Sequence, residues 1–284
     1  MAGKVRREVA QEVIDWVRAG NSQPGLAVVL VGNDPASVSY VRGKELASSE
    51  VGIHSETRRL SADVTQEELL NVVEELNNNP TITGFLVQLP LPAQIKQDVV
   101  LHAIDPNKDV DGIHPFNMGM LLAGTPRLTP ATPSGVLRLL EEEDIPTSGK
   151  HIVICGRSNI VGRPLAALLL KRGNSGDATV TVCHSRTVNL RSFTRQADIL
   201  VTAMGLPGFI TKDMVKEGAV VIDVGTVRVG DPSRKRGWRL VGDIAEGVRE
   251  VAAITTPVPG GVGPMTIAML LKNVMQAARI TSEQ

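Results

Sequence analysis

The feature of this sequence that most constrains its fold is an alternation of strand-length apolar runs with segments of helical period. Two such runs occupy residues 26–31 and 84–89. Four more runs, rich in β-branched residues, occupy 151–155, 178–183, 198–203 and 219–224. Alternation of this kind is typical of α/β proteins with parallel sheets. The sequence therefore predicts two α/β domains, of which the second has the rhythm of a Rossmann-type dinucleotide-binding domain.

Helix boundaries are predicted from capping residues. Asp34 is expected to cap a helix that has Pro35 at its first position and ends at Gly52. The basic, polar segment 228–239 is expected to form an exposed loop or hairpin. Further helices are predicted at about 135–143, 164–171 and 265–279, with a short one within 206–218.

Length, charge and cysteine content exclude several classes of protein. A chain of 284 residues is long enough for two domains. Its 30 basic and 30 acidic side chains cancel, which argues against nucleic acid or a membrane surface as a partner. Cys155 and Cys183 each end an apolar run, so we expect no disulfide framework and no metal site. Residues 1–14 resemble neither a signal peptide nor a membrane span, and we expect a cytoplasmic protein.

The segment Tyr40-Val41-Arg42-Gly43-Lys44 places a lysine on an otherwise apolar helix face. Tyr40 and Lys44 lie one helical turn apart, and Ala47 and Val51 continue the stripe. One interpretation is a lysine whose amine reaches past this face to water. The other is a partly desolvated lysine with a lowered pKa, able to exchange protons near neutral pH. Tyr40, the only tyrosine, would then form a wall for a flat ligand.

Two further segments carry polar groups that suit a catalytic site. In Val87-Gln88-Leu89 the glutamine stands at the end of a predicted strand, where α/β folds bind ligands. It either bonds a lysine or a substrate carbonyl, or it only caps the strand. The three acidic residues of 105–111 suggest calcium, but their spacing does not match an EF-hand loop. We expect a turn-rich loop in which Asp111 is the inward-facing carboxylate.

The segment 155–164 has the strand–turn–helix context of a dinucleotide fingerprint, with Ser158 where a middle glycine is usual. Backbone N–H groups at such a helix start can bind a pyrophosphate. The next strand ends in His184-Ser185-Arg186-Thr187 and lacks the acidic residue that holds the ribose of NAD. Hydroxyl groups, Arg157 and Arg186 suit a 2′-phosphate, so NADP is favoured over NAD. We expect His184 to be structural and not a metal ligand.

The segment 256–266, TPVPGGVGPMT, precedes the last predicted helix. Its glycines permit close backbone approach to a ligand, and its prolines stiffen the loop. A plain interdomain linker is the alternative, although a linker need not be this apolar or rigid. Thr266 is expected to interact with the start of the final helix.

Taken together, these motifs resemble the bifunctional methylenetetrahydrofolate dehydrogenase/methenyltetrahydrofolate cyclohydrolase family. They occur in the family's order and spacing over essentially the whole chain. The resemblance implies a folate-binding domain of residues 1–134 completed by a helix at 265–284, an NADP-binding domain at 135–264, a cleft between the two, and a homodimer. The strings that carry it are YVRGK at 40–44, VQLPLP at 87–92, KDVDG at 108–112, PATPSG at 130–135, GRSNIVGRP at 156–164 and TPVPGGVGPMT.

The resemblance also implies roles for single residues in an enzyme that oxidises 5,10-methylenetetrahydrofolate and hydrolyses the methenyl product. Lys44 matches the catalytic lysine, Gln88 its hydrogen-bond partner, Tyr40 the ring that stacks on folate, and Asp111 the carboxylate that holds the pterin. Further substrate contacts are expected at Val87, Leu89, Pro259, Gly260 and Gly263. Cofactor contacts are expected at Gly156, Arg157, Ser158, Ile160, His184, Ser185, Thr226 and Thr266.

The chain departs from the family pattern at several positions. Gly3-Lys4 stands almost at the start, where the family has a short strand before this pair. Ala131 occupies a position where cysteine is common, and Thr226-Val227 replaces the usual Ile-Asn beside the expected nicotinamide. Ser185 stands where the mitochondrial NAD-using relatives carry arginine, which favours NADP.

Three other interpretations compete with this one. A shikimate- or glutamyl-type dehydrogenase would share the architecture and a catalytic lysine, but it leaves TPVPGGVGPMT unexplained. A catalytically silent folate-binding protein would not need Lys44, Gln88 and Asp111 together. An enzyme with only one of the two activities is the third alternative.

Overall fold

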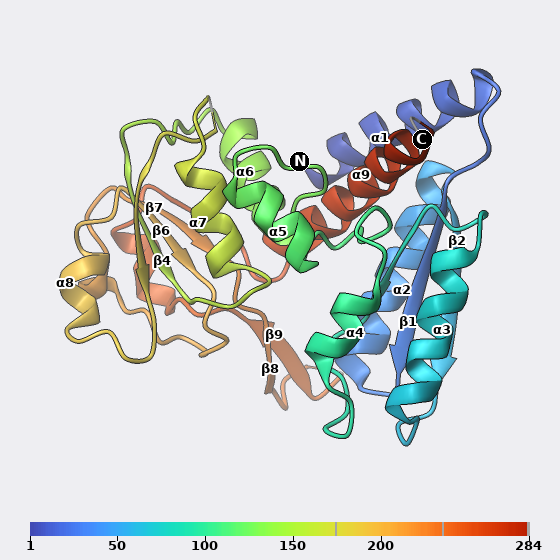
Figure 1. The fold of residues 1–284 in the computed structure, drawn as a ribbon. Helices are drawn as coiled ribbons and strands as arrows, with labels where there is room; N and C mark the ends of the chain where they lie inside the picture. The colour runs from blue at the N-terminus through green and yellow to red at the C-terminus, as the bar shows by residue number, and fades with distance from the viewer. Residues whose placement is uncertain (174, 235, 283–284) are drawn as a thin grey trace. The chain divides into compact units, whose positions relative to one another are not determined.

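The computed structural model describes residues 1–173, 175–234 and 236–282, which belong to two compact units (Figure 1). Unit 1 comprises Met1–Ala131 and Ile267–Gln284, and unit 2 comprises Thr132–Thr266. Each unit contains its own parallel sheet. The predicted α/β class is therefore confirmed. None of the described helices combines the length and apolar character that a membrane span needs.

Unit 1 is built on a three-stranded parallel sheet in the order β2-β1-β3. The central strand is β1 (Gly25–Val31), flanked by β2 (His54–Leu60) and β3 (Gly84–Val87). The helices that lie wholly in this unit are α1 (Ala2–Arg18), α2 (Pro35–Val51), α3 (Gln66–Asn78), α4 (Gln97–Ala103) and α5 (Pro115–Leu122). Helix α9 (Val262–Ser282) begins in unit 2 and contributes its later turns to unit 1.

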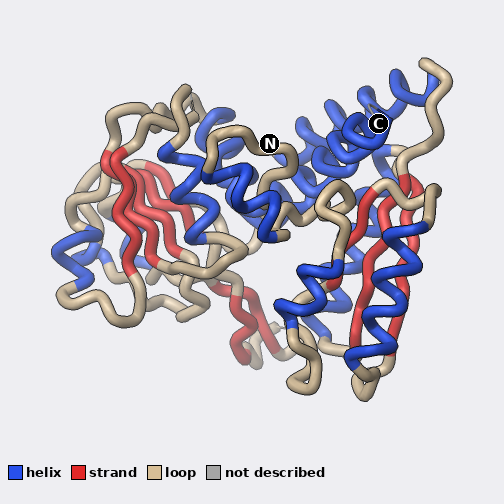
Figure 2. The backbone as a smooth tube through the Cα atoms, viewed as in Figure 1, coloured by secondary structure: helices blue, strands red, loops and turns tan. Residues whose placement is uncertain are grey.

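Strand β1 is buried along its whole length because helices cover both faces of its sheet. Alternate side chains of a strand point to opposite faces. Leu26, Val28 and Leu30 accordingly pack in one core cluster with α2 and α9, whereas Ala27 and Val29 pack in another with α3 and α4. Figure 2 shows helices flanking the strands of this unit. The continuous apolar run at 26–31 is thus the signature of a covered parallel strand.

The local signals at the start and end of α2 are confirmed. The Asp34 carboxylate accepts a hydrogen bond from the backbone N–H of Ser37 at 2.8 Å, and Pro35 is the first helical residue. Gly52 ends the helix with φ +81°, in the left-handed region where glycine avoids a Cβ clash. These caps fix which residues α2 presents to the core.

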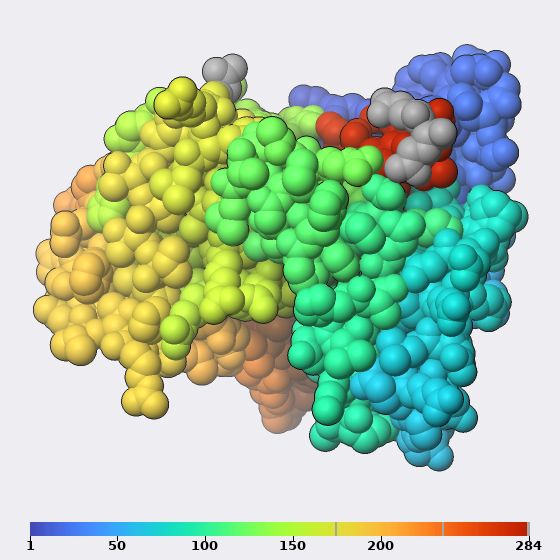
Figure 3. All heavy atoms as spheres, viewed as in Figure 1, coloured from blue at the N-terminus to red at the C-terminus, as the bar shows by residue number. Residues whose placement is uncertain are grey.

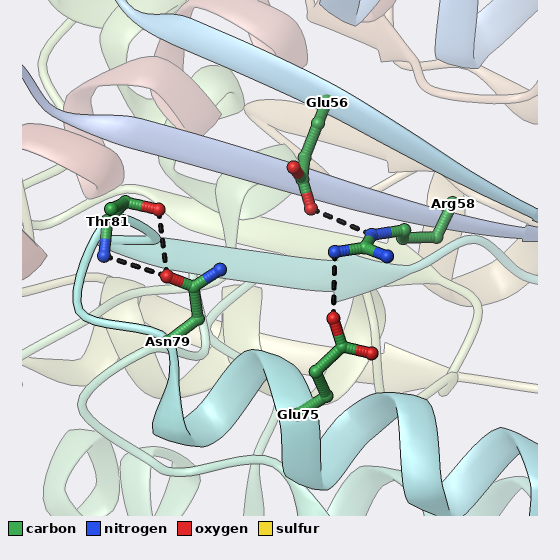
Figure 4. Close-up of polar contacts among 5 residues, drawn as sticks. All are labelled: Glu56, Arg58, Glu75, Asn79 and Thr81. Atoms are coloured by element: carbon green, nitrogen blue, oxygen red, sulfur yellow. Dashed lines mark hydrogen bonds and ion pairs between the residues drawn. The ribbon is translucent and has the colours of Figure 1, made fainter.

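Polar contacts join the edge strand β2 to the neighbouring helix α3, whose surface is visible in Figure 3. The Arg58 guanidinium donates to Glu56 on its own strand and to Glu75 on α3, each at 2.9 Å (Figure 4). The Asn79 side-chain oxygen accepts from the backbone N–H and hydroxyl of Thr81 in the turn before β3. Exposed ion pairs of this kind contribute roughly 0.2–1 kcal/mol each, so they support the unit without defining a site.

Unit 2 is built on a five-stranded parallel sheet in the order β10-β7-β6-β4-β5. Because β4 lies between β5 and β6, the strand order reverses there, and doubly wound folds bind ligands at the carboxyl ends of strands at such a point. A separate antiparallel hairpin joins β8 and β9. The strands are β4 (His151–Cys155), β5 (Thr179–Cys183), β6 (Ile199–Thr202), β7 (Val220–Asp223), β8 (Val227–Gly230), β9 (Trp238–Val241) and β10 (Ile254–Thr255).

The helices of unit 2 differ from the predictions at several ends. The helices are α6 (Ala131–Glu142), α7 (Gly162–Leu170), α8 (Leu190–Thr194) and two 3-10 turns, η1 (Lys212–Met214) and η2 (Glu246–Glu250). The helix predicted within 206–218 is only the single turn η1. Helix α9 begins at Val262, three residues earlier than predicted, because its first turn tolerates Pro264, whose missing N–H needs no partner there. The hairpin predicted at 228–239 is confirmed.

The two cysteines are free and buried, and they are paired in register, side by side, at the ends of the parallel strands β4 and β5. Burial raises the pKa of the Cys155 thiol to about 12. Buried thiols of this kind behave as small apolar side chains.

Candidate functional site

The side chains of Lys44 and Gln88 meet in unit 1. Lys44 lies on the buried face of α2 with Val41 and Ala47, and only 8% of its surface is exposed. Its Nζ donates a hydrogen bond to Gln88 Oε1 at 3.1 Å. The amine therefore does not reach past the helix to bulk water, and the interpretation of Lys44 as a snorkelling lysine is wrong.

Burial lowers the pKa of Lys44, because the ammonium form loses its hydration, and the negative charge of Asp111 partly opposes this effect. The partner in direct contact, Gln88, is neutral and so does not restore the charged form as a carboxylate would. A neutral amine keeps a lone pair that can accept a proton. The site can therefore hold a base whose working pH lies below that of an ordinary lysine.

Gln88 is held in a defined orientation. It directly follows β3, and its backbone N–H donates to Val29 of β1 at 2.8 Å, which extends the sheet by one residue. Its Nε2 donates to the carbonyl of Leu89 at 2.8 Å, and this leaves Oε1 for Lys44. Val87 is buried and Leu89 half-buried on either side. Gln88 thus caps the strand end and bonds the lysine at once.

The loop that follows Lys108 corrects one expectation. Asp109, not Asp111, is the buried carboxylate: it is 2% exposed, whereas Asp111 is half-buried. Asp109 accepts hydrogen bonds from the backbone N–H groups of Gly112 and His114 and from Asn117 Nδ2, at 3.1, 2.7 and 2.9 Å. Asp109 shapes the turn, and this leaves the Asp111 carboxylate free to act on Lys44 through its charge.

A distant helix holds the same loop in place. Asn273 of α9 donates to the carbonyls of Val110 and Thr129, at 2.8 and 2.7 Å. The backbone N–H of Ala131 donates to the carbonyl of Asp111 at 3.3 Å. The position of Asp111 therefore depends in part on a residue more than 150 positions along the chain, Asn273.

Tyr40 lies one turn before Lys44 on α2 and is 40% exposed. Its ring is available at the surface of unit 1 and is not part of the core. This exposure fits a ring that covers a flat ligand. A shared apolar stripe predicts similar burial for Tyr40 and Lys44, but Tyr40 is much more exposed than Lys44.

In unit 2, the turn after β4 forms a tight cradle of backbone. Gly156 has φ +136°, and a Cβ there would lie 2.4 Å from the carbonyl oxygen of Ala203, which follows β6. A Cβ on Gly162 would lie 2.0 Å from the carbonyl oxygen of Gly156. Only glycine allows this approach of the turn to the neighbouring strand and to its own helix. The geometry fits the phosphate-binding turn of a dinucleotide fold.

The other residues expected at this turn are exposed. Arg157, Ser158 and Ile160 lie at the surface between β4 and α7. The Ser158 hydroxyl accepts from the backbone N–H of Val161 at 3.1 Å and so fixes the approach to the helix. The middle position of the fingerprint is thus used for a side-chain hydrogen bond where other proteins use glycine.

The turn after β5 carries the other expected cofactor contacts. The imidazole of His184 accepts from the backbone N–H of Arg186 at 3.1 Å, and the His184 N–H donates to the hydroxyl of Thr187. His184 therefore holds this turn through hydrogen bonds of both its imidazole and its backbone N–H. Ser185 and Arg186 are exposed, and no acidic side chain follows β5 before Asn189.

The remaining expected contacts lie on two segments of unit 2. Thr226 is exposed after β7, and Pro259 and Gly260 are exposed before α9. Gly263 lies in the first turn of α9 and not in the preceding loop. The Thr266 hydroxyl contacts the carbonyl of Val262 at the start of α9 and the hydroxyl of Thr132, which confirms the expected contact with the helix start.

Sequence reasoning missed four residues that shape these sites. Gly162 had a detectable signal, since it is a second glycine at the opening of a helix. Asp109 lies in a motif whose carboxylates sequence alone could not rank by burial. Asp223 and Asp243 are almost fully buried near the ends of β7 and β9, and they gave no signal because most of their hydrogen-bond partners are remote in sequence.

Comparison with known proteins places these features in one family. The family model for the tetrahydrofolate dehydrogenase/cyclohydrolase catalytic domain matches residues 1–111, and the model for the NAD(P)-binding domain of the same family matches 130–282. The bifunctional protein FolD of Salinibacter ruber is 56% identical over 97% of this chain and 92% of its own length.

Solved structures agree. A bifunctional methylenetetrahydrofolate dehydrogenase/cyclohydrolase from Campylobacter jejuni is 45% identical with a TM-score of 0.91, over 99% of this chain and 96% of its own. The dehydrogenase-cyclohydrolase of Trypanosoma brucei, complexed with NADP cofactor and an inhibitor, is 40% identical with a TM-score of 0.94, over 100% of this chain and 96% of its own.

Proposed function

Because this chain belongs to the tetrahydrofolate dehydrogenase/cyclohydrolase family, we propose that Lys44, Gln88, Asp111 and Tyr40 form its catalytic site. The protein is a bifunctional enzyme of one-carbon folate metabolism. It oxidises 5,10-methylenetetrahydrofolate to the methenyl form with NADP and hydrolyses that product to 10-formyltetrahydrofolate. The observation that carries the proposed site is the buried Lys44 bonded to a neutral amide.

Lys44 acts in hydrolysis as a neutral amine. The methenyl substrate is a cation, so a permanently charged lysine would repel it, and burial removes that obstacle by lowering the pKa of Lys44. The free lone pair then orients the attacking water and accepts a proton from it as the water adds to the methenyl carbon. General-base help of this kind is worth roughly 10²–10⁴-fold.

Gln88 and Asp111 set the state of the lysine. The Gln88 amide accepts from Nζ without adding charge, and so it holds the amine in position while leaving it neutral. Asp111 opposes the effect of burial and keeps the pKa of Lys44 from falling further. In the proposed site its carboxylate also accepts hydrogen bonds from the pterin's amino and ring nitrogens, and Tyr40 stacks on the ring. The resemblance to the family supports Val87, Leu89, Pro259, Gly260 and Gly263 as further proposed substrate contacts.

The residues of unit 2 fit NADP. The glycine cradle at Gly156 and Gly162 leaves no room for side chains where a pyrophosphate approaches a fold of this type. NADP, when bound, accepts the hydride of the oxidation. Arg157, Ser158, Ser185 and Arg186 supply the cations and hydroxyls that suit its 2′-phosphate. Ile160, His184, Thr226 and Thr266 are proposed as further contacts.

The finer organisation is part of the same proposal. Unit 1 is the proposed folate-binding domain and unit 2 the proposed NADP-binding domain. The predicted boundaries, 1–134 with 265–284 and 135–264, lie within three residues of these units. The enzyme is a homodimer in the cytoplasm. The exposed edge strand β5 and the two free thiols support these last two assignments, since an uncovered edge strand invites pairing and free thiols suit a reducing compartment.

The activities are tested by absorbance at the methenyl-folate band, with purified protein, 5,10-methylenetetrahydrofolate and NADP or NAD. We expect the band to form with NADP and then to decay faster than in buffer. Absence of the band with both cofactors would refute the dehydrogenase assignment. Light scattering on the eluting protein tests the dimer, and a mass of 30.3 kDa in solution would contradict it.

A further inference from the structure

Two buried aspartates occupy the region where the strands of unit 2 end. Asp223 is the last residue of β7, and Asp243 follows β9 by two residues. Their side chains are 1% and 0% exposed. A carboxylate this deeply buried is retained only when hydrogen bonds compensate the lost hydration. The partners of the two carboxylates therefore indicate what they hold.

Asp243 holds the loop that follows β6. Its Oδ2 accepts from the backbone N–H of Met204 and its Oδ1 from that of Leu206, both at 2.7 Å. These short distances are typical of charge-assisted hydrogen bonds. The same loop contains Ala203, whose carbonyl oxygen lies against the Gly156 turn. Asp243 thus fixes the segment 203–206 on the side of the proposed phosphate cradle.

Asp223 holds Asp243 and the end of β7. Its Oδ1 accepts from the backbone N–H groups of Asp243 and Gly225 at 3.0 and 3.1 Å and from the Thr202 hydroxyl at 3.0 Å. Its Oδ2 accepts from the N–H of Ile244 at 3.1 Å. One carboxylate therefore joins the ends of β6 and β7 to the chain that returns from the hairpin.

The two carboxylates are packed so closely against the backbone that no side chain fits at the neighbouring glycines. A Cβ on Gly225 would lie 2.4 Å from the Asp243 carboxylate, and a Cβ on Gly242 would lie 1.9 Å from that of Asp223. Burial raises the pKa of Asp223, and the nearby Asp243 adds to this effect. The close packing therefore fixes where each carboxylate lies, and a buried carboxyl with a perturbed pKa is more typical of a functional site than of a simple core.

We propose that Asp243, supported by Asp223, is the positioning residue of the dehydrogenase reaction: it holds the loop 203–206 in the shape that receives the dinucleotide, and it has no part in hydrolysis. The carboxyl ends of β6 and β7 are the edge where a doubly wound sheet binds its dinucleotide. The proposed hydrolytic residues Lys44 and Gln88 belong to unit 1. Hydrolysis can therefore be measured on the same variant as a control for a loss that is confined to the dehydrogenase reaction. This inference rests on the dehydrogenase activity of the family.

The test is Asp243→Asn. An amide has one acceptor oxygen, so its NH₂ group would face one of the two backbone N–H groups and the loop would lose a hydrogen bond. We expect kcat/KM for NADP to fall at least tenfold, with KM for NADP raised and KM for folate unchanged. Hydrolysis of methenyltetrahydrofolate, measured without cofactor, stays within twofold of the wild type. NADPH binding, followed by its fluorescence, weakens in parallel.

Asp213→Asn is the matched control, because Asp213 is an exposed aspartate of the same unit. It is expected to leave both activities within twofold. If Asp243→Asn keeps its dehydrogenase activity, or loses both activities by the same factor, the positioning role is refuted. If the wild-type protein itself had no dehydrogenase activity, that result would refute the dehydrogenase function of this chain and not the positioning role of Asp243.

A milder variant covers the case in which Asp243→Asn fails to fold. Thr202→Val removes one hydrogen bond to Asp223 and keeps the shape of the side chain. We expect its dehydrogenase activity to fall about two- to fivefold while hydrolysis is unchanged. Equal loss of the two activities, or loss of neither, in a variant with wild-type circular dichroism would again contradict the proposal.

Discussion

The proposed sites of the two units are built from different parts of the polypeptide, side chains in unit 1 and backbone in unit 2. In unit 1 the site is made of side chains, since a lysine on α2 meets a glutamine that follows β3. In unit 2 the cradle is made of backbone, since glycines at 156 and 162 bring the turn against its neighbours and buried aspartates hold the adjacent loop. The difference suits the two tasks, because proton transfer needs a group with a tuned pKa whereas a dinucleotide needs a preformed surface. Substitutions in the two units should therefore separate the two activities.

The largest expected effect is that of Lys44→Met on hydrolysis. Methionine has a similar length and suits a buried site, but it has no lone pair to accept a proton. We expect hydrolysis of methenyltetrahydrofolate to fall at least about 100-fold, while NADP binding survives. The decay of the methenyl band measures the rate. Lys96→Met, at an exposed lysine of unit 1, is the control. If Lys44→Met hydrolysed the substrate within threefold of the wild-type rate, Lys44 would not have the proposed role of general base.

The opposite separation is expected from Gly156→Ala. The new methyl group would lie 2.4 Å from the Ala203 oxygen, and the backbone would keep a φ that side chains avoid. Strain of about 1–3 kcal/mol predicts NADP affinity weakened roughly ten- to 100-fold, with hydrolysis retained. Gly173→Ala is the matched control, because Gly173 has φ +119° but open space around it. Equal NADP affinities for these two variants, measured by NADPH fluorescence, would show that the contact with Ala203 is unimportant.

A smaller effect, with a distinct pH signature, is expected from Gln88→Glu. Burial lowers the pKa of Lys44 in the wild type, so the neutral, active amine is populated below the usual range of lysine and hydrolysis rises as pH rises through that pKa. A carboxylate in contact with Nζ favours the ammonium form and raises this pKa. The rate at pH 7 should fall about tenfold and recover at higher pH.

The pH–rate profile of hydrolysis, corrected for the buffer reaction, checks this shift. Gln88→Met, which removes the hydrogen bond without adding a charge, is the comparison variant. A profile for Gln88→Glu that keeps the wild-type midpoint would mean that Lys44 does not titrate in the observed range.

The smallest expected effect concerns cofactor choice. Arg157 and Arg186 are exposed, so solvent weakens any ion pair that they form with a 2′-phosphate. Replacing either by alanine should reduce the preference for NADP over NAD about three- to tenfold, with little change in the rate with NAD. The ratio of kcat/KM values for the two cofactors is the measurement. Arg195→Ala, at an exposed arginine elsewhere in unit 2, should leave the ratio unchanged.

Local chemistry let the sequence alone predict much of this molecule. Six strands, β1 and β3 to β7, were predicted within a few residues, because a strand covered on both faces must be apolar throughout, as β1 is from Gly25 to Val31. The polar, partly exposed edge strand β2 was not predicted, because it lacks this apolar run. Asp34, Pro35 and Gly52 marked the ends of α2 because caps bond residues within one turn. The turn after β4 was recognisable for the same reason, since its glycine and its helix start are adjacent in the chain.

Only the tertiary structure decided which polar groups meet. Lys44 could have been a surface lysine until β3 brought Gln88, 44 positions away, against its amine. Asp109 and Asp111 are two residues apart, yet only Asp109 is buried. The Asn117 side chain and the backbone of the turn surround the Asp109 carboxylate and donate hydrogen bonds to it. Asp243 has its partners nearly 40 positions back, at Met204 and Leu206. Burial and pKa depend on neighbours contributed by distant segments. For that reason the sequence predicted the chemistry of these sites, but only the fold showed which groups lie together.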